Sequence, residues 1–539
     1  MAQWNAQTLA DVLTRDAELF PEQEALVIGV QRLDYAQLKR RVDETAQGLR
    51  ALGVRRGDHV AVCMGNTVEW ALFFYAAATI GAVTVPVNTR FKADELAYCL
   101  EQADVKLLFV VDRFLRIDFV EMLRGICPAI DSTLPDAALP KLENVVVLGS
   151  NVPRAAIRFD DMLALGITHD VPEFDDVTPG DVLLMQFTSG TTSYPKGVML
   201  THDNMLRNAA YVAERFDLKQ ADRYYSSRVF YHVAGSTLSL LAALAVGACL
   251  ISSETFDGSQ ALRIMSEEAC THTSGNDTMF LMILNAPDFD RYPLKLRGGW
   301  ASAGPEVSRL AIERLGMKGL CHAYGLSEAS PNVSMSWHHD DLDKRVNGWG
   351  HVLEGLDVSI ADPETGKELP PGATGEILVR GWSVMKGYYK MPEQTAKAID
   401  AQGWLHTGDY GIMDEDGRLR FASRIKDVFR VGGENVAPAE VEDVLHKHPK
   451  IKQAQVIGVP DPRLIEVPAA YVILREGERA TPEEIIDWSK SRMANFRVPR
   501  YVRIVTTFDD IGMTGSNKVQ KNKLRAQALI DFGLSEKQT

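Results

Sequence analysis

The first residues that could do chemistry form one run, Thr188-Ser189-Gly190-Thr191-Thr192-Ser193-Tyr194-Pro195-Lys196-Gly197. Glycines let a backbone approach phosphate oxygens, hydroxyls donate hydrogen bonds, and a lysine supplies the positive charge that leaving pyrophosphate needs. The apolar residues 182–187 predict a buried strand before the run, and Thr201 or Asp203 could cap a helix after it. The spacing differs from the G-x-x-x-x-G-K-[ST] loop, so the common nucleoside-triphosphatase interpretation fails. We therefore predict a loop that wraps a polyphosphate, rather than a hydroxyl-rich surface turn.

This run resembles the phosphate-binding signature Thr-Ser-Gly-Thr-Thr-Gly-x-Pro-Lys-Gly of the adenylate-forming superfamily, which includes acyl-CoA synthetases, nonribosomal adenylation domains and luciferases. Ser193 stands where the superfamily usually has glycine. The resemblance implies that the nucleotide phosphates are held by Thr188, Ser189, Gly190, Thr191, Thr192 and Lys196. It also implies that Lys196 is a catalytic residue, because its charge holds the departing pyrophosphate.

A second segment, Tyr324-Gly325-Leu326-Ser327-Glu328, resembles the Tyr-Gly-x-Thr-Glu element of the same superfamily. The resemblance implies nucleotide contacts from Tyr324, Gly325, Ser327 and Glu328. Glu328 and Thr188 are the implied ligands of Mg²⁺, a hard cation that prefers oxygen ligands and keeps several waters.

Three further segments resemble nucleotide-binding motifs and follow the order of the superfamily. Ala301-Ser302-Ala303-Gly304-Pro305 is similar to a stretch whose backbone lies along adenine, which implies contacts from Ser302, Ala303 and Gly304. Trp404-Leu405-His406-Thr407-Gly408-Asp409 matches Trp-x-x-Thr-Gly-Asp, and the acceptor-only carboxylate of Asp409 suits the two ribose hydroxyls. Ser423-Arg424-Ile425-Lys426-Asp427 resembles Gly-Arg-x-Lys-Asp, which implies that Arg424 reaches ribose or phosphate and that Lys426 is the hinge between domains.

The C-terminal part carries two more motifs. Gly432, Gly433 and Glu434 begin a segment that resembles the loop forming part of the thiol tunnel, which implies binding of coenzyme A. Met513-Thr514-Gly515-Ser516-Asn517-Lys518 is similar to the element whose lysine catalyses adenylation, although Asn517 replaces its glycine. The resemblance implies that Lys518 binds the nucleotide and neutralises charge on the carboxylate and the α-phosphate in the transition state.

The acyl pocket is the least specified part of the site. The resemblance places it beside His232, Val233, Ala234, Gly235, Trp300, Ala301 and Leu326, with His232 as a catalytic gate next to the carboxylate. The small residues Ala234 and Gly235 leave room for a chain or a ring, and no arginine or lysine lies between residues 231 and 246. We therefore predict an apolar pocket for a medium-chain, alicyclic or aromatic monocarboxylic acid. Asp277 replaces the proline of a Gly-x-Pro-Thr-Met pattern at the predicted pocket floor.

The chain has 539 residues, of which 46% are hydrophobic and 24% charged, so it can bury large cores and should form more than one domain. Strand-like residues 59–64, 106–111 and 145–148 alternate with helix-like residues 35–52 and 66–80, which predicts an α/β architecture. Leu38, Val42, Ala46 and Leu49 recur at helical spacing and should be core. The resemblance implies a large N-terminal domain of α/β subdomains with a small β-structured part, residues 1–425. A small mobile α+β domain, residues 426–539, would carry the catalytic lysine.

Charge and composition exclude several classes of protein. The net charge of −14 argues against a nucleic-acid-binding protein, because phosphate backbones attract an excess of lysine and arginine. We find no apolar run of the length of a membrane span and no secretory signal, so we expect neither secretion nor an integral membrane protein. The six cysteines lack C-x-x-C spacing, which argues against a zinc site or a disulfide framework. We expect a cytoplasmic protein and leave a homodimer open.

Together the motifs imply an AMP-forming ligase that uses ATP, Mg²⁺ and coenzyme A. The carboxylic acid would react with ATP to give an acyl-adenylate and pyrophosphate, and the thiol of coenzyme A would then take the acyl group. Three alternatives stay open: a carrier protein as the acceptor, luciferase-like oxygenation of the adenylate, and a nucleotide-binding pseudoenzyme. A nonribosomal module would continue into a carrier domain, which the short stretch after Lys518 leads us not to expect.

Overall fold

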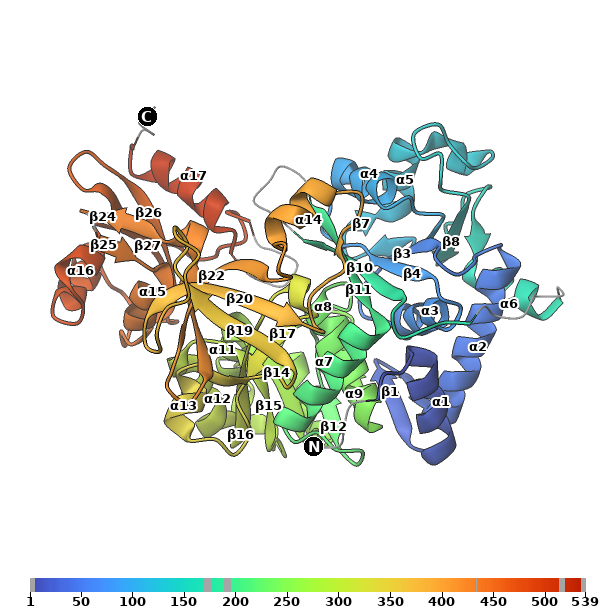
Figure 1. The fold of residues 1–539 in the computed structure, drawn as a ribbon, viewed down its shortest axis with the longest axis horizontal. Coiled ribbons are helices and arrows are strands. Elements are labelled where there is room, and N and C mark those ends of the chain that lie inside the picture. The colour runs from blue at the N-terminus through green and yellow to red at the C-terminus, as the bar shows by residue number, and fades with distance from the viewer. Residues whose placement is uncertain (1–4, 169–175, 189–194, 433, 513–518, 535–539) are drawn as a thin grey trace.

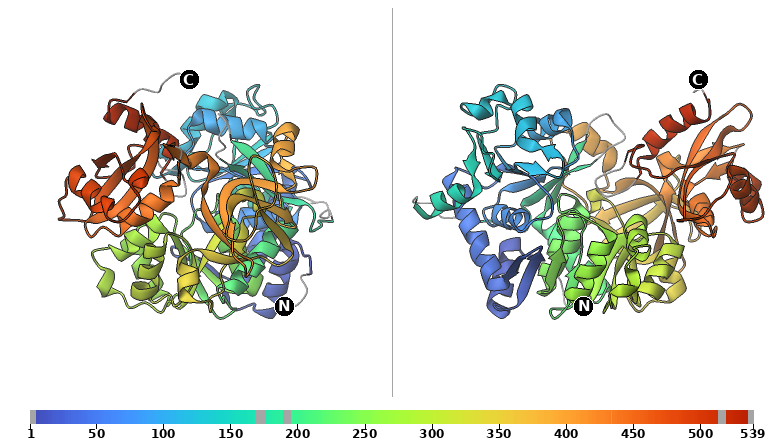
Figure 2. Two further views of the ribbon diagram at one scale, coloured as in Figure 1. Left: turned by 60° about the vertical axis from the view of Figure 1, so that its left-hand side comes forward. Right: turned by 180° about the vertical axis from the view of Figure 1, so that it is seen from behind.

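The computed structural model describes residues 5–168, 176–188, 195–432, 434–512 and 519–534, apart from the side chains of Lys426 and Asn435. Several predicted site residues lie outside this part of the chain: Ser189, Gly190, Thr191, Thr192, Gly433 and Lys518, together with the motif departures Ser193 and Asn517. A large N-terminal domain and a small C-terminal domain, coloured orange to red, stand beside each other in all views (Figures 1 and 2).

The first sheet of the large domain has eight strands and a parallel centre. In spatial order the strands are β21 (Gly387–Tyr388), β11 (Lys196–Thr201), β10 (Val182–Thr188), β4 (Val83–Pro86), β3 (His59–Cys63), β5 (Leu107–Val111), β8 (Asn144–Leu148) and β9 (Ile157–Arg158). One core cluster includes residues of α2 (Tyr35–Ala51), α3 (Val68–Thr79) and α6 (Phe159–Thr168). The other cluster of this sheet includes α4 (Ala93–Gln102) and α5 (Phe119–Ile126). Helices therefore cover the strands on both sides, as the alternation in the sequence predicts.

The second sheet is longer and changes character along its length. Its parallel part contains β1 (Glu24–Ile28), β13 (Cys249–Ser252), β12 (Arg223–Tyr225), β14 (His272–Asn276), β15 (Gly298–Ser302) and β16 (Gly319–Gly325), with β2 (Gln31–Asp34) at the edge. The antiparallel part continues through β17 (Asn332–Met335), β18 (Trp349–Val352), β23 (Arg418–Arg424), β22 (Leu405–Met413), β20 (Thr374–Gly381) and β19 (Leu356–Ala361). The antiparallel strands form the predicted β-structured part of the large domain.

Helices of the second sheet belong to two clusters. α1 (Leu9–Leu19), α7 (His202–Arg215) and α9 (Ala242–Val246) share the core that lies between the two sheets. α10 (Gly258–Glu267), α11 (Asp277–Leu284) and α12 (Pro305–Leu315) cover the opposite face. Shorter helices are α13 (Leu342–Val346) and α14 (Pro392–Ala398). None of the helices in the described ranges has both the length and the apolar character needed to cross a bilayer.

The small domain has its own five-stranded sheet and its own core. The strands are β24 (Phe429–Val431), β25 (Glu434–Val436), β26 (Ile451–Asp461), β27 (Ile465–Leu474) and β28 (Tyr501–Ile504), and the helices are α15 (Pro438–His446), α16 (Pro482–Lys490) and α17 (Lys521–Asp531). α15 contacts α12 of the large domain. Because β23 ends at Arg424 and the new sheet begins at Phe429, the predicted boundary between residues 425 and 426 falls in the connection, yet it stays a prediction.

The local rules of the sequence explain where two helices begin. Asp34 caps α2 in a capping box with Gln37, and Leu38, Val42, Ala46 and Leu49 of this helix are all buried, as predicted. α7 begins with Thr201 as its N-cap, and Asp203 lies in its first turn, so the threonine rather than the aspartate is the cap.

Candidate active site

The predicted pyrophosphate lysine lies beside a glutamate that is distant in the sequence. Lys196 begins β11, where it pairs with Thr188 at the end of β10. β21 runs antiparallel to β11, and this places the ring of Tyr388 4.0 Å from Nζ of Lys196. The Tyr388 hydroxyl donates a 2.9 Å hydrogen bond to Oε1 of Glu328. One tyrosine thus holds the cation and the carboxylate of the predicted phosphate site in a fixed relation.

The electrostatics of this group favour a neutral tyrosine. Burial and the neighbouring Glu328 raise the pKa of Tyr388, so its hydroxyl keeps the proton that it donates. Oγ1 of Thr188 is buried, and the described part of the chain offers it no hydrogen-bond partner. A buried hydroxyl of this kind can serve as a ligand for a cation or a phosphate.

The donor set fits Mg²⁺ bound together with phosphates. Within the described ranges, His, Cys, Asp and Glu residues nowhere gather in threes in a way that could hold a metal ion by themselves. Mg²⁺ is usually bound through one or two carboxylates plus substrate phosphates and waters. Glu328 and Thr188 offer one carboxylate and one hydroxyl, which suits this mode.

The predicted ribose residues form a second group. Asp409 on β22 pairs directly with Arg424 on β23, and Nε of Arg424 lies 3.6 Å from Oδ1 of Asp409. The hydroxyl of Tyr324 donates a 2.9 Å hydrogen bond to Oδ2 of the same buried carboxylate. Phe421 stacks on Tyr324 with the ring centroids 5.5 Å apart. Burial and the Asp409 charge raise the pKa of Tyr324, so it remains a donor that orients Asp409.

One short segment, Tyr324–Glu328, connects the group around Tyr388 and Glu328 to the group around Asp409. Tyr324 is in β16, and Glu328 is in the 3₁₀ turn Ser327–Ala329 that follows directly. Gly325 between them has no room for a side chain, since a Cβ there would lie 2.1 Å from the carbonyl oxygen of Pro331. The sequence motif Tyr324–Glu328 therefore connects the predicted phosphate group to the predicted ribose group.

The predicted adenine segment lies at the carboxyl end of β15. Ser302 ends this strand, and Gly304 is the N-cap of α12. The amide of Gly304 donates a 2.8 Å hydrogen bond to Oδ1 of Asp277, which is the first residue of α11. A Cβ on Gly304 would also lie 3.1 Å from Oδ1 of Asp443 in α15 of the small domain. Asp277, which departs from the superfamily pattern, thus holds the adenine segment and faces the small domain.

Residues of the predicted acyl pocket lie on a tight turn. His232 precedes the short helix α8 (Val233–Gly235), and its Nδ1 accepts a 3.2 Å hydrogen bond from the amide of Ala234. The tautomer with the proton on Nε2 fits this contact. Gly235 is required by close packing, since a Cβ there would lie 2.1 Å from the carbonyl oxygen of Val229. The chain continues as a π-helix (Ser236–Leu241), a form that is frequent at functional sites.

The other predicted acyl-pocket residues belong to two different hydrophobic clusters. Trp300 belongs to the core between the two sheets, and Ala234 and Leu326 pack against that core. Ala301 belongs to the cluster of α11 and α12, because successive side chains of a strand point to opposite faces. Its side chain therefore lies outside the group around Trp300. Arg228 lies just before the stretch of residues 231 to 246, in which the sequence has no arginine or lysine. Its guanidinium lies over Trp300, with Cζ 4.1 Å from the centre of the ring.

The predicted coenzyme A residues lie in the small domain. Gly432 follows β24 with φ of +60°, a left-handed conformation that favours glycine, and Glu434 begins β25 with an exposed side chain. Lys426 lies in a 3₁₀ turn, Ile425–Asp427, between the two domains.

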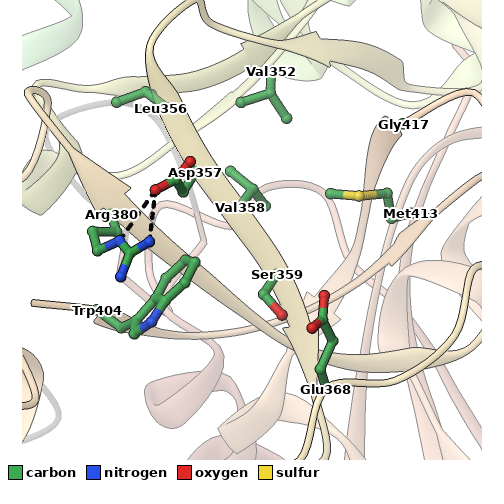
Figure 3. A pocket seen from close by; sticks show the side chains of 10 residues that line it. All are labelled: Val352, Leu356, Asp357, Val358, Ser359, Glu368, Arg380, Trp404, Met413 and Gly417. Carbon is green, nitrogen blue, oxygen red and sulfur yellow. Dashed lines mark hydrogen bonds and ion pairs between the residues drawn. The ribbon is translucent and has the colours of Figure 1, made fainter. Parts of the chain in front are cut away.

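A hollow of about 470 Å³ opens elsewhere, on the antiparallel part of the second sheet (Figure 3). Figure 3 shows that Arg380 points across to Asp357 on the neighbouring strand, with hydrogen bonds of 3.1 and 2.9 Å, and lies over Trp404. None of the residues lining this hollow is a predicted site residue, and the ion pair is internal to the sheet. The hollow is therefore separate from the candidate active site.

Four residues around the site carry no signal in the motifs: Tyr388, Phe421, Arg228 and Asp443. Tyr388 lies 60 residues after Glu328, and only the pairing of β21 with β11 brings it back. The neighbouring residues Lys386 and Gly387 offer no spacing pattern from which this contact could be read. Strand pairing places Tyr388 and Phe421, whereas Arg228 follows β12 and Asp443 lies on α15.

The chain is similar to known proteins over nearly its whole length. The AMP-binding enzyme family matches residues 13–389, and the AMP-binding enzyme C-terminal domain matches residues 440–518. YngI of Bacillus subtilis, a protein named as an acyl-CoA synthetase, is 38% identical and covers 100% of both chains. The mitochondrial medium-chain acyl-CoA ligase ACSF2 of Bos taurus is 36% identical over 97% of this chain and 87% of its own.

A solved structure agrees with these relatives. The anthranilate CoA ligase AuaEII, crystallised with anthranoyl-AMP, has a TM-score of 0.87 and 25% identity over 99% of both chains. The superposition includes both the large and the small domain. Taken with the family matches and the two groups around Tyr388 and Asp409, these similarities show that the chain belongs to the AMP-binding enzymes of the adenylate-forming superfamily, in the branch of the acyl-CoA synthetases.

Proposed function

We propose that this AMP-forming acid–thiol ligase activates a carboxylic acid with ATP and passes the acyl group from the adenylate to coenzyme A. A carboxylate is a poor electrophile, whereas a mixed anhydride with AMP is open to attack by a thiol. The observation that carries the proposal is the contact of Tyr388 with both Lys196 and Glu328. It fixes one cation and one carboxylate side by side, as a Mg²⁺–polyphosphate needs.

The first half-reaction is electrostatic and needs no protein nucleophile. Lys196 and Thr188 would hold the departing pyrophosphate, and Glu328 with Thr188 would hold Mg²⁺, which neutralises phosphate charge when it is bound. Asp409, oriented by Tyr324, would accept hydrogen bonds from the ribose hydroxyls, with Arg424 beside it. Lys518 would neutralise the charge that develops on the α-phosphate.

The second half-reaction involves the small domain. Lys518, Gly432 and Glu434 all belong to this domain, so one orientation cannot readily serve both steps. Rotation about Lys426 would exchange them, since hinges absorb such motion in a few backbone angles.

For the acid we propose a medium-chain, alicyclic or aromatic skeleton. Small residues beside His232 and the apolar core around Trp300 support this choice. The relatives named for medium-chain acids and for anthranilate agree with it. We further propose a cytoplasmic location, which the six free, buried cysteines support.

The test is incubation of the protein with ATP, MgCl₂, coenzyme A and a panel of carboxylic acids, with AMP and thioester measured separately. We expect AMP and acyl-CoA in equal amounts for the preferred acids and neither product without the acid. AMP without thioester would favour another acceptor. Failure of every acid to release AMP from ATP would reject the proposal.

A further inference from the structure

Arg228 lies at the edge of the sheet where ligands bind in folds of this kind. It follows β12, whose neighbours β13 and β14 run parallel to it, and ligands lie outside the carboxyl ends of such strands. The side chain of Asn66 fixes the local backbone, because its Nδ2 donates to the carbonyl oxygen of Arg228 at 3.0 Å and its Oδ1 accepts from the amide of Phe230 at 2.8 Å. The position of Arg228 is therefore built into the fold.

The guanidinium lies over an aromatic ring. Its Cζ lies 4.1 Å from the ring of Trp300, and Nε1 of Trp300 donates a 2.9 Å hydrogen bond to the buried hydroxyl of Tyr224. This stacking is a favourable cation–π contact. It occupies one face of the guanidinium and leaves the hydrogen-bonding edge unused.

That edge has no partner in the described part of the chain. Nε and Nη2 of Arg228 are both buried without a hydrogen-bond acceptor, and no described carboxylate forms an ion pair with the side chain. Leaving such donors unsatisfied is costly, more so for a charged group. Burial lowers the pKa of Arg228 to about 10, so the group still carries its charge at neutral pH.

The same edge binds carboxylates elsewhere in this protein. Nε and Nη2 of Arg56 donate to the two carboxylate oxygens of Asp181 at 3.0 and 2.8 Å. These two donors are parallel and match the spacing of the two oxygens of a carboxylate. The free edge of Arg228 thus has the shape of a carboxylate-binding site that the chain does not fill.

We propose that Arg228 binds a second carboxylate at the far end of the acid substrate, so that the enzyme prefers dicarboxylic acids. The inference rests on the proposed function and replaces the monocarboxylic acid that the sequence predicts with a dicarboxylic acid. The reacting carboxylate lies next to His232 and the nucleotide, whereas the second one pairs with Arg228 over Trp300.

The test compares acids that differ only at the far end. Straight-chain α,ω-dicarboxylic acids of increasing length are each paired with their half methyl ester and with the monocarboxylic acid of equal carbon number. The value of kcat/KM for AMP release is measured for the parent, for Arg228→Met and for Arg228→Lys. Arg207→Met is the matched control, because Arg207 of α7 also lies over a tryptophan, Trp382, at 4.5 Å and is not a predicted site residue. Calorimetric titration of the best diacid into each protein measures binding without turnover.

At the best length we expect the parent to favour the diacid over its half ester by about a hundredfold, since a site built for a polar partner rejects the analogue without it. Arg228→Met should remove this preference while keeping turnover of the half ester, Arg228→Lys should keep part of it, and Arg207→Met should not change it. Equal turnover of diacids and half esters at every length in the parent would overturn the inference. So would an equal loss for both acids in Arg228→Met, or no binding heat from any diacid. Release of AMP with none of the acids would instead reject the proposed function, and the inference with it.

Discussion

The hydroxyl of Tyr388 donates a 2.9 Å hydrogen bond to Oε1 of Glu328, although Tyr388 lies on β21 of the eight-stranded sheet and Glu328 in the 3₁₀ turn after β16 of the longer sheet. The ring of the same tyrosine lies 4.0 Å from Nζ of Lys196. The hydrogen bond fixes the orientation of the carboxylate, and the ring holds the lysine by a cation–π contact. The geometry of the proposed pyrophosphate site therefore depends on a residue outside the motifs identified in the sequence.

Tyr388→Phe should slow adenylation about ten- to hundredfold, because a hydrogen bond to a charged group is worth about 1.5–3 kcal/mol. The ring and its contact with Lys196 remain, so the loss reports the hydroxyl alone. Pyrophosphate release in single turnovers at several Mg²⁺ concentrations measures the effect. Tyr389→Phe is the matched control, because its hydroxyl bonds to Asp104 instead. Equal rates for the two variants would contradict the role of Tyr388.

Lys518→Ala should abolish adenylation and spare thioester formation from supplied acyl-adenylate. One positioned charge commonly contributes about 10²–10³ to the rate. Rates of both half-reactions are measured separately, and the exposed Lys523→Ala is the control. An equal loss in the two half-reactions, or a loss of adenylation smaller than about tenfold, would count against the assigned role.

Lys426→Pro should leave adenylation largely intact and sharply reduce thioester formation, because proline fixes φ near about −65° and removes the freedom that a hinge needs. Lys426→Ala removes only the side chain and should be tolerated. Single-turnover measurements of both steps in the two variants separate backbone freedom from lost charge. A proline variant as active as the parent in thioester formation would reject domain rotation at this residue.

Docking of the small domain should weaken as the pH rises from about 4 to 7. Burial, followed by the charges of Asp277, Glu442 and Glu440, raises the pKa of Asp443 from its ordinary value of 3.8 to about 7, against the opposing effect of Lys447. Undocking would return this pKa toward 3.8, so the docked form binds more protons between these values and loses stability as the pH rises.

The measurement is energy transfer between dyes on cysteines introduced at the exposed positions 313 of α12 and 487 of α16, since the six native cysteines are buried. Transfer in the parent should fall across this pH range. Asp443→Asn should make transfer almost independent of pH. The same pH profile in both proteins would show that this carboxyl does not control docking.

Local pattern was enough to predict many elements. The apolar spacing and the capping residue Asp34 specify α2, and the apolar run before Thr188 specifies β10. These elements depend on neighbours within a few residues, so their positions follow from periodicity and capping. The two domains and the order of nucleotide motifs followed from the family resemblance rather than from periodicity.

Contacts between distant strands could not be predicted in the same way. Arg228 lies outside residues 231 to 246, where a cation for the acyl pocket was considered. Its position over Trp300 depends on how β12 and β15 lie on either side of β14. Asp277 was placed by the sequence at the predicted pocket floor; in the structure its carboxylate accepts a hydrogen bond from the amide of Gly304, and Asp443 lies close to the same glycine. In both cases the sequence shows the residue, but the residue that it contacts follows only from the three-dimensional structure.

Since Tyr388 lies on the edge strand β21 of the eight-stranded sheet and Glu328 follows β16 of the longer sheet, a nucleotide bound beside both residues would connect the two sheets. Nucleotide binding would then stabilise both sheets, because unfolding of either sheet would release the ligand. Saturating nucleotide should merge their unfolding into one transition at a higher temperature. Acids that fit poorly would leave the bound nucleotide, and with it the connection between the two sheets, in place. The two sheets would then stay together while different acids bind and dissociate.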